Sequence, residues 1–391
     1  MTGTRRIGLA LLAGVVAACG GEHVDAAAWG GVVDTLPSGT VVVSSPATGT
    51  WTEATAWTVE ESLRIGVADG VGPEVLGRVS AIEVAPNGQI LIMDDAANEL
   101  RTFTPDGEHA WTVGRAGAGP AEFRGVIGVR FDRHGDLWTV DAGNARYTIV
   151  DGERDFRSHA RPTAVYDLPW LGGFSPDGML YDQGRDVSGS VQDAILFRIA
   201  RVGSTAGPVP LPAIDLPVPR VGTMTLPLPF ALRMLRSWDD RGLVWQAASS
   251  DYRLVAFVPG GDTVMVVSRD IVSDMLPTDA RDSVQRYARA LENEFGSMGL
   301  VVPAGAIPDR IAPLRWFVPD DEGYLWVCAT GLRPCSRLDV FGADGRYLGE
   351  VEMPVPLLDS PRPLVRRGNI YAMIEGPAGE PVLFRGEVVR P

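Results

Sequence analysis

The sequence predicts an all-β fold assembled from a repeated unit of short strands, and three observations support this. Segments such as "AIEVAPNGQILIMD" and "IGVRFDRHGDLWTVD" join two apolar runs through a glycine turn, the pattern of a β-hairpin. Such turns recur six times, at Gly88, Gly135, Gly178, Gly242, Gly323 and Gly368. Their spacing is about 45 residues except in two longer intervals, which suits a four-stranded blade. We therefore predict a single-domain, six-bladed β-propeller of four-stranded antiparallel blades.

The first two units carry the repeat most completely. Each continues from its second run, which ends in aspartate, through a loop with asparagine to a third run and a second Asp-Gly turn. Later units are degenerate: Asp182 comes early in "MLYDQG", and "LVWQAA" has no acid. "GRAGAGPAEFRGVIGVRFDRHGDLWTVDAGNAR" resembles an NHL-type repeat. Residues 57–390 are similar to six-bladed β-propeller lipoproteins of environmental bacteria, a resemblance that implies fold and location more than mechanism.

Closure of the ring is expected from the segment ahead of the first repeat. "WTVEESLRIG", residues 57–66, reads as a strand, and the C-terminal unit has room for only three strands. Because an unpaired edge strand invites aggregation, we expect 57–66 to complete the sixth blade. The propeller then covers 57–391. Residues 19–56 form a tether, with an extra strand or hairpin in "DTLPSGTVVVSSPATGTW" packed outside the ring.

Two insertions, 204–229 and 271–312, interrupt the repeat. The first is rich in proline and should be irregular. In the second, Val284, Tyr287, Leu291 and Phe295 share one helical face, which predicts a helix over 278–296, between blades 4 and 5, with Thr278 as its N-cap. Both insertions follow the last strand of a blade. We therefore expect them on one face of the ring, flanking the mouth of the channel as a partial lid.

The glycine-rich stretch "GRAGAGPAEFRG", residues 114–125, raises the possibility of a phosphate-binding loop. It lacks the G-x-x-x-x-G-K pattern, and the chain contains no lysine. No helical periodicity follows it, so we interpret it as the connection between the first two blades. The net charge of −14 argues against nonspecific binding of nucleic acid.

The N-terminus predicts export and lipid anchoring. "MTGTRR" is a positive n-region and "IGLALLAGVVAA" an apolar segment too short to span a bilayer. The following "VAAC" resembles the lipobox of bacterial lipoproteins, which implies a signal peptide over 1–18 and lipidation of Cys19. The alternative is an ordinary secretory peptide with a chance cysteine. The protein is then expected on a bacterial membrane, facing the periplasm or the cell exterior.

Two further cysteines, Cys328 and Cys335, lie on either side of a short loop rich in turn-forming residues. If their flanks pair as a hairpin, the thiols face each other, and an exported compartment permits a disulfide. The alternative is two buried free cysteines.

The candidate binding residues lie in loops expected on the elaborated face. Asp95 with Asn98, and Asp141 with Asn144, form two D-x-x-N loops that either bind a ligand or bond their own backbone as Asx turns. Arg115 and Arg146 are the cations expected beside the channel mouth, with Arg124 and Arg333 as further candidates. Trp170 is the tryptophan least explained by packing between blades.

These features favour a binding or protein-interaction scaffold whose partner is a peptide, a glycan or an envelope protein. The alternative is a metal-dependent, lactonase-like hydrolase. Propellers resembling gluconolactonases hold a divalent ion through acids and amides at the inner strands, whereas strand starts such as "FALRMLR" and "PLVRRG" offer no such set. The four histidines are scattered. We therefore expect neither a metal site nor a cofactor.

Replacing the lipobox cysteine tests the anchor. Cys19→Ala should release the protein into the soluble fraction or stall its processing, because no thiol remains to carry the lipid. Membrane fractionation with mass spectrometry of the mature N-terminus measures this. A variant that stays membrane-bound and is cleaved at the same residue contradicts the lipobox.

Overall fold

The computed structural model describes residues 29–163, 170, 172–185, 194–199, 205–212, 216–221, 224–226, 228–329 and 334–391. The predicted signal peptide, Cys19 and Arg333 lie outside these residues. Among the helices that the model describes, none has the length and hydropathy needed to cross a bilayer.

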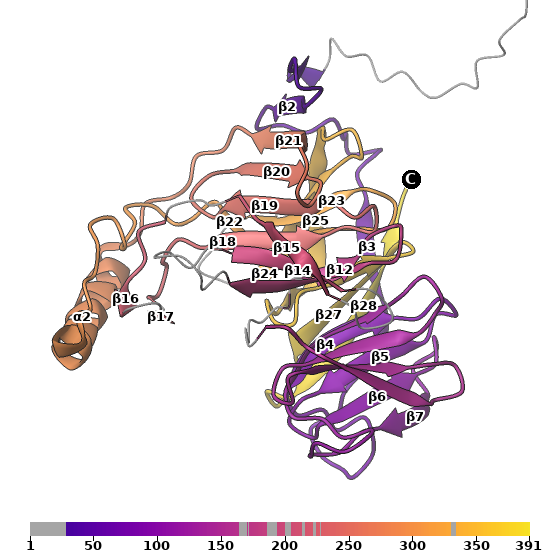
Figure 1. The fold of residues 1–391 in the computed structure, drawn as a ribbon. Helices are drawn as coiled ribbons and strands as arrows, with labels where there is room; N and C mark the ends of the chain where they lie inside the picture. Colours follow the sequence, from indigo (N-terminus) through magenta and orange to yellow (C-terminus); the bar gives the residue numbers. More distant parts are fainter. Residues whose placement is uncertain are drawn as a thin grey trace, which may run out of the picture.

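The described chain is a β-propeller whose sheets surround a common axis (Figure 1). Five sheets are four-stranded and antiparallel, with strands in chain order from the axis outward in most of them. They consist of β4 (Val79–Val84), β5 (Ile90–Asp94), β6 (Glu99–Phe103) and β7 (His109–Val113); β8 (Val126–Phe131), β9 (Leu137–Asp141), β10 (Arg146–Val150) and β11 (Phe156–Ala160); β12 (Gly172–Phe174), β13 (Leu180–Arg185), β14 (Ala194–Ile199) and β15 (Thr205–Pro210); β22 (Leu314–Pro319), β23 (Leu325–Ala329), β24 (Cys335–Phe341) and β25 (Tyr347–Leu357); and β26 (Leu364–Arg366), β27 (Asn369–Glu375), β28 (Pro381–Val389) and β3 (Thr58–Ile65).

The prediction of six four-stranded blades is wrong in its count, because the described residues form five. At the fourth repeat the sheet has six strands instead: β18 (Met234–Trp238), β19 (Val244–Ala248), β20 (Arg253–Phe257) and β21 (Thr263–Arg269), extended by β2 (Val41–Ser45) and β1 (Val32–Thr35). β2 pairs in parallel with β21. The outer strand of a blade exposes unpaired backbone groups, and here the N-terminal hairpin occupies that edge.

The ring closes through its innermost strands and through one strand from the N-terminal side. Among the first strands, β4 contacts β8 and β26, while β18 contacts β12 and β22, and β22 contacts β26. The rings of Trp138 and Phe174, 5.6 Å apart, join the second and third sheets. β3 pairs antiparallel with β28, so the segment predicted to complete the last sheet lies in that position.

The recurring turn after the first strand has a chemical explanation in three sheets. Asp320 accepts hydrogen bonds from the backbone N–H groups of Glu322 (3.0 Å) and Tyr324 (2.7 Å) and from the indole of Trp326 (2.9 Å). The same arrangement holds at Asp132 with Trp138 and at Asp239 with Trp245. One carboxylate therefore satisfies both the turn and a buried tryptophan of the next strand, which accounts for the repeated Asp, Gly and Trp.

Buried acid–base clusters join neighbouring sheets. Asp182 on β13 is fully buried and accepts hydrogen bonds from Tyr147 of the preceding sheet (2.6 Å), from Arg161 (2.6 Å) and from Trp170 (2.7 Å). Burial, with the Asp182 charge next in importance, raises the pKa of Tyr147 well above its ordinary value. Asp339 on β24 repeats the arrangement with Tyr252, Arg269 and Tyr347. Each of these two carboxylates therefore links neighbouring sheets through hydrogen bonds.

The two insertions pack on each other to form an arm that projects from the side of the ring (Figure 1). It contains α2 (Thr278–Phe295), the 3₁₀ turn η1 (Gly296–Met298) and the hairpin of β16 (Arg220–Val221) and β17 (Met224–Thr225). Leu228 of the first insertion shares a small core with Ala288 and Leu291 of α2. No described residue of either insertion lines the channel, so they form an arm beside the ring.

Two details of the helix differ from expectation. Pro277 occupies the N-cap position without a side-chain cap, and Thr278 is already helical. Tyr287 is 43% exposed, whereas the buried positions are Val284, Ala288 and Leu291. The arm buries only a narrow strip of α2, so the tyrosine at the margin of that strip faces solvent.

A disulfide joins Cys328 at the end of β23 to Cys335 at the start of β24, with their Cα atoms 6.1 Å apart.

The buried cluster around Asp182 predicts a large stability effect. Asp182→Ala should lower the free energy of unfolding by about 3–5 kcal/mol, because it removes the carboxylate that compensates a buried arginine. Glu350→Ala, which breaks the exposed pair with Arg337, is the matched control and should cost at most about 1 kcal/mol. Urea denaturation followed by near-ultraviolet circular dichroism measures both. Equal effects would contradict a role for Asp182 between the sheets.

Candidate functional site

The candidate site is the channel along the propeller axis. Its cavity of about 120 Å³ is lined by residues from the first strand of every sheet. We call the face that bears the turns after these first strands the lower face, and the face that bears the connections between sheets the upper face. The channel therefore runs from the starts of the first strands, at the upper face, to their ends at the lower face.

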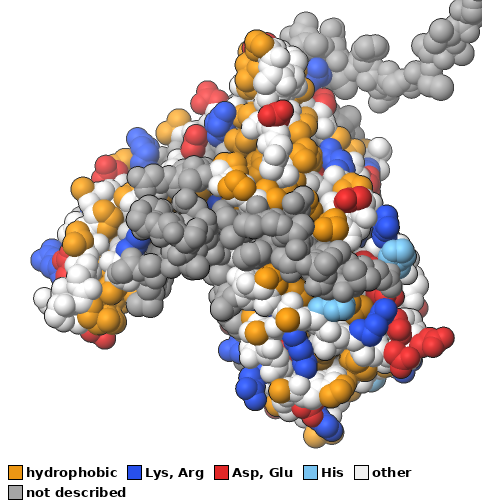
Figure 2. Space-filling model, in the orientation of Figure 1, with side chains coloured by type: hydrophobic (Ala, Val, Ile, Leu, Met, Phe, Trp, Pro, Cys, Tyr) orange, Lys and Arg blue, Asp and Glu red, His pale blue; other side chains and the backbone are white. Residues whose placement is uncertain are grey.

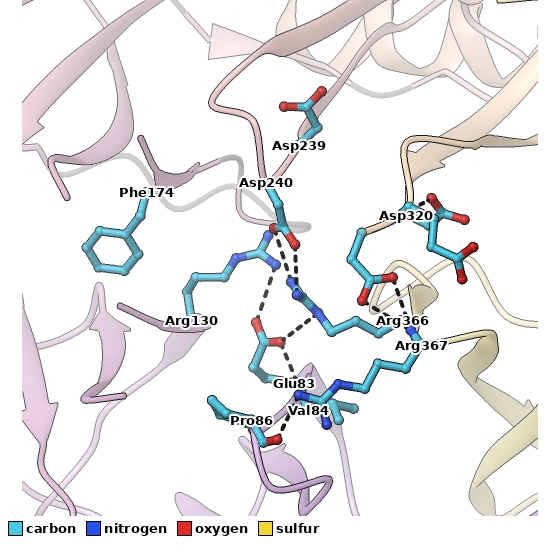
Figure 3. A network of polar contacts seen from close by, with 12 residues as sticks. Glu83, Val84, Pro86, Arg130, Phe174, Asp239, Asp240, Asp320, Arg366 and Arg367 are labelled. Atoms are coloured by element: carbon cyan, nitrogen blue, oxygen red, sulfur yellow. Dashed lines mark hydrogen bonds and ion pairs between the residues drawn. The ribbon is translucent and has the colours of Figure 1, made fainter. Parts of the chain in front are cut away.

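An ion-pair network closes the lower end of the channel (Figure 3). Arg366 at the end of β26 donates to both carboxylate oxygens of Asp240, at 2.8 and 3.2 Å. Glu83 at the end of β4, only 2% exposed, lies 3.3 Å from Arg130 and 3.6 Å from Arg366. Figure 3 shows Arg130 and Arg366 converging on Glu83 and Asp240 from different sheets. Four sheets thus contribute one charge each, and the charges balance.

The pKa values of the network follow from its geometry. Burial acts to raise the pKa of Asp240, but the charges of Arg366 and Arg130 outweigh it and hold this pKa below its ordinary value. Burial acts to lower the pKa of Arg366, and Glu83 and Asp240 reverse this, so its pKa is raised. Asp240 and Arg366 therefore both keep their charge at neutral pH.

A second set of hydrogen bonds, made by Arg367, lies beside this network at the lower face. The backbone N–H of Arg367 donates to Asp321 (3.0 Å), and its guanidinium donates to the carbonyl of Pro86 (2.7 Å). Arg367 holds the left-handed backbone conformation (φ 52°) that the two-residue turn between β26 and β27 requires. The cavity of about 280 Å³ outside the network is walled by these lower-face turns.

Trp170 forms part of the channel wall ahead of β12. Its ring lies so close to Gly128 and Gly172 that a Cβ at either position would come within 2.5 Å or less of it. Its indole N–H is held by Asp182 at 2.7 Å. The tryptophan that the sequence singled out therefore faces the channel, and two glycines make room for it.

Three arginines lie at or just before the starts of first strands, at the upper face. Arg362 lines the cavity two residues before β26. Arg233 lies immediately before β18, and Arg315 is the second residue of β22. Arg315 is paired with Asp359, Nε to carboxylate at 2.6 Å, and the same carboxylate accepts the indole N–H of Trp316 (2.9 Å).

The electrostatics of Arg362 reflect these neighbours. Burial lowers the pKa of Arg362 to about 10; Asp359 acts to raise it, and the charges of Arg233 and Arg315 lower it further. Within the part of the chain that the structure describes, no hydrogen bond or ion pair joins Arg362 to another residue.

The arginines and aspartates expected at the upper face bond mainly to their own loops. Arg146 donates to the carbonyls of Ala118 (2.8 Å), Gly119 (2.9 Å) and Glu122 (2.5 Å), which fixes the glycine-rich connection. Arg115, 78% exposed at its side chain, pairs with Glu122 at 2.8 Å. Both arginines therefore take part in holding residues 114–125.

The D-x-x-N loops are also bonded internally. Fully buried Asp141 accepts from Asn144 (2.7 Å) and from the backbone N–H of Arg124 (3.2 Å), and Asn144 donates to the carbonyl of Gly117 (2.8 Å). In the first sheet Asp95 pairs with Arg78, and Asn98 has a left-handed backbone (φ 58°). Neither loop contributes a lining residue to the described channel. Binding at these residues stays a prediction.

Sequence reasoning missed the residues that do line the channel. Arg236 and Arg366 lie in the strand starts "FALRMLR" and "PLVRRG", which offer no acid or amide, and Arg362 directly precedes the second of them. The available signal was positional: residues that begin the first strand of a blade face the upper mouth. By the same reasoning, Glu83 and Asp240, at the other ends of such strands, are expected to face the lower mouth.

Among the described residues, no group of three or more His, Cys, Asp or Glu side chains is placed to hold a metal ion.

Comparisons with known proteins place the chain by fold. No family model and no curated protein matches this sequence. It is similar to the crystal structure of a protein from Bacteroides fragilis NCTC 9343 whose name describes it as exported, with 11% identity, a TM-score of 0.51 and coverage of 89% of this chain and 100% of that one. A gluconolactonase from Xanthomonas campestris shares 14% identity, with a TM-score of 0.43 over 80% and 86% of the two chains.

A third similar structure is the virginiamycin B lyase from Staphylococcus aureus, at 11% identity and a TM-score of 0.39 over 80% of this chain and 84% of that one. At these identities the likeness shows the propeller fold alone.

The charges at the lower mouth predict a pH dependence. Because the pKa of Asp240 is lower in the folded than in the unfolded state, its ionised form stabilises the fold above the unfolded pKa of about 3.9. This contribution is lost as the pH falls through the folded pKa. Asp240→Asn should therefore lower the Tm at pH 7, and the difference from wild type should shrink below about pH 4. A Tm difference that is constant from pH 7 to pH 3 contradicts this assignment.

Proposed function

We propose that this chain is an exported, lipid-anchored lipoprotein whose NHL-like propeller acts as a binding or protein-interaction scaffold. The sequence of residues 1–19 supports the anchor, and the repeat supports a ring of six units, with the six-stranded sheet as the fourth. The anchor holds the scaffold at a bacterial membrane, facing the periplasm or the cell exterior. Its partner is a peptide, a glycan or an envelope protein.

The observation that carries this proposal is the apolar surface of the arm. Five large apolar side chains on or beside it are exposed: Val272 (83%), Met275 (57%), Tyr287 (43%), Met298 (61%) and Val301 (68%). Figure 2 shows hydrophobic side chains on the surface of the arm where it leaves the ring. Apolar surface exposed on an elaborated loop, beside a rigid scaffold, is typical of an interaction site.

Polar groups complete the proposed surface. Arg115 on the 114–125 connection and the D-x-x-N loops of Asp95, Asn98, Asp141 and Asn144 belong to the same face by topology, and Arg146 holds that connection in shape. In this proposal the arm supplies apolar contact and the connection supplies hydrogen bonding and charge.

The alternative, a metal-dependent lactonase on the same propeller, requires carboxylates free to bind an ion at the channel. In the described channel Glu83 and Asp240 are instead engaged by Arg130 and Arg366. The scaffold is therefore the function that the geometry favours.

Capture of partners tests the scaffold. The variant Met275→Ser/Tyr287→Ser/Met298→Ser/Val301→Ser should lose most partner capture from solubilised envelopes, because it removes apolar contact while leaving the buried side of α2 intact. Quantitative mass spectrometry of the captured material measures this. Val67→Ser/Val71→Ser, which replaces two valines that are 44% and 105% exposed outside the arm, is the control. Unchanged capture by the arm variant contradicts the proposal.

A further inference from the structure

Arg362 differs from three arginines that the fold pairs with carboxylates. Arg161 pairs with Asp182, Arg269 with Asp339 and Arg366 with Asp240. Within the described residues Arg362 has no such partner, although it lines the axial cavity. The Arg362 side chain is only partly exposed, and a guanidinium that loses water without gaining a partner carries a desolvation cost. The fold therefore places a cation in the wall of the channel that no described residue neutralises by direct contact.

The surroundings add positive charge. Of the described charged groups that act on Arg362, Arg233 and Arg315 are cations and Asp359 is a carboxylate, so that these four groups carry a formal charge of +2. This local excess occurs in a chain of net charge −14. Since like charges close together repel, the arrangement favours binding of an anion that offsets the excess.

Arg362 lies toward the upper end of the axial cavity. Arg362 precedes Pro363, which favours an extended backbone, and four residues of extended chain place it about 13 Å from Arg366. The balanced network of Arg366, Asp240, Glu83 and Arg130 closes the lower end. An anion that enters from the upper face therefore reaches Arg362 first. The charge-balanced network lies beyond it, at the lower end.

The walls set the size and kind of ligand. The cavity of about 120 Å³ accepts a group of a few heavy atoms. Trp170 contributes a flat apolar wall, held in place by Asp182. The planar guanidinium fork of arginine matches the paired oxygens of carboxylates and phosphates, and it binds them in bidentate fashion.

From these observations we propose that the upper end of the channel binds the oxyanion group of a ligand, a carboxylate or a phosphoryl group. Arg362 is its direct contact, and Arg233 and Arg315 supply supporting charge. This inference rests on the proposed scaffold function, which it deepens by naming the chemistry of one ligand. The site lies in the ring and is separate from the apolar surface of the arm.

The experiment measures binding of sodium phosphate and sodium acetate to the full chain at constant ionic strength, with sodium chloride as the reference salt. Either oxyanion should raise the Tm of the wild type in a saturable manner, since a ligand specific for the folded state stabilises it. Phosphate acting alone identifies a phosphoryl site, and acetate acting alone identifies a carboxylate site.

Variants separate binding from folding. Arg362→Met should weaken the oxyanion by about tenfold to a hundredfold, the effect of losing a charged hydrogen-bond pair. Its Tm without ligand should equal or exceed that of the wild type, because an uncompensated charge has been removed. Arg362→Lys keeps the charge without the fork and should recover only part of the affinity. Arg337→Met, which removes an arginine 65% exposed on the outer part of its sheet, is the control and should bind as the wild type does.

Two results would overturn the inference: no specific rise in Tm with either oxyanion in the wild type, or Arg362→Met binding as tightly as the control. Partner capture by the same variants keeps the two proposals apart. If capture persists while oxyanion binding is absent, the scaffold stands and the channel site fails. If oxyanion binding persists while the arm variant captures as well as the wild type, the channel site stands and the scaffold fails.

Discussion

The pairing of β3 with β28 is the constraint on which the rest of the structure depends. The ladder runs from Leu383 opposite Ile65 to Val389 opposite Thr58, so the last sheet is completed by a strand from the other end of the propeller. An open series of sheets would leave β26 without its neighbour β4 and would expose the edge of β28. Once this pairing forms, the first strands of the sheets face one axis, and every residue of the channel takes its place from that closure.

Closure brings charged first-strand residues into one narrow space, and the fold treats the two ends of that space differently. At the lower end each cation finds a carboxylate from another sheet, as Arg366 does with Asp240. These contacts bind the sheets together where the turns are short. At the upper end, where the connections are long, Asp359 pairs with Arg315, and Arg362 and Arg233 add further positive charge. The two ends of the channel thus differ in charge: the lower end is charge-balanced, and the upper end retains positive charge.

Much of the fold was predictable because its signals are local. An aspartate at the start of a turn, a glycine within it and a tryptophan six residues after the aspartate are coupled through one carboxylate, as at Asp320 and Trp326. The order of the strands, the closing segment and α2 follow from such patterns. The parallel addition of β2 to β21 was not predictable in this way, since Val43 and Val267 meet across more than two hundred residues and no turn links them. The blade count failed at that point.

The sequence predicted the types of the site residues and the face on which they lie. It could not predict which residue each of them bonds, because bonding partners depend on the folded structure. Arg115 and Arg146 were chosen because their loops lie on the upper face. In the structure both side chains bond to residues of the glycine-rich connection. Arg362 looked ordinary in the sequence, and its interest comes from the lack of an acidic partner among the described residues, which only the assembled ring reveals. Proteins commonly give up stability where function requires a group in an unfavourable state. Arg161, Arg269 and Arg366 each have a carboxylate partner, and the contrast with Arg362 argues for a partner supplied from outside the chain.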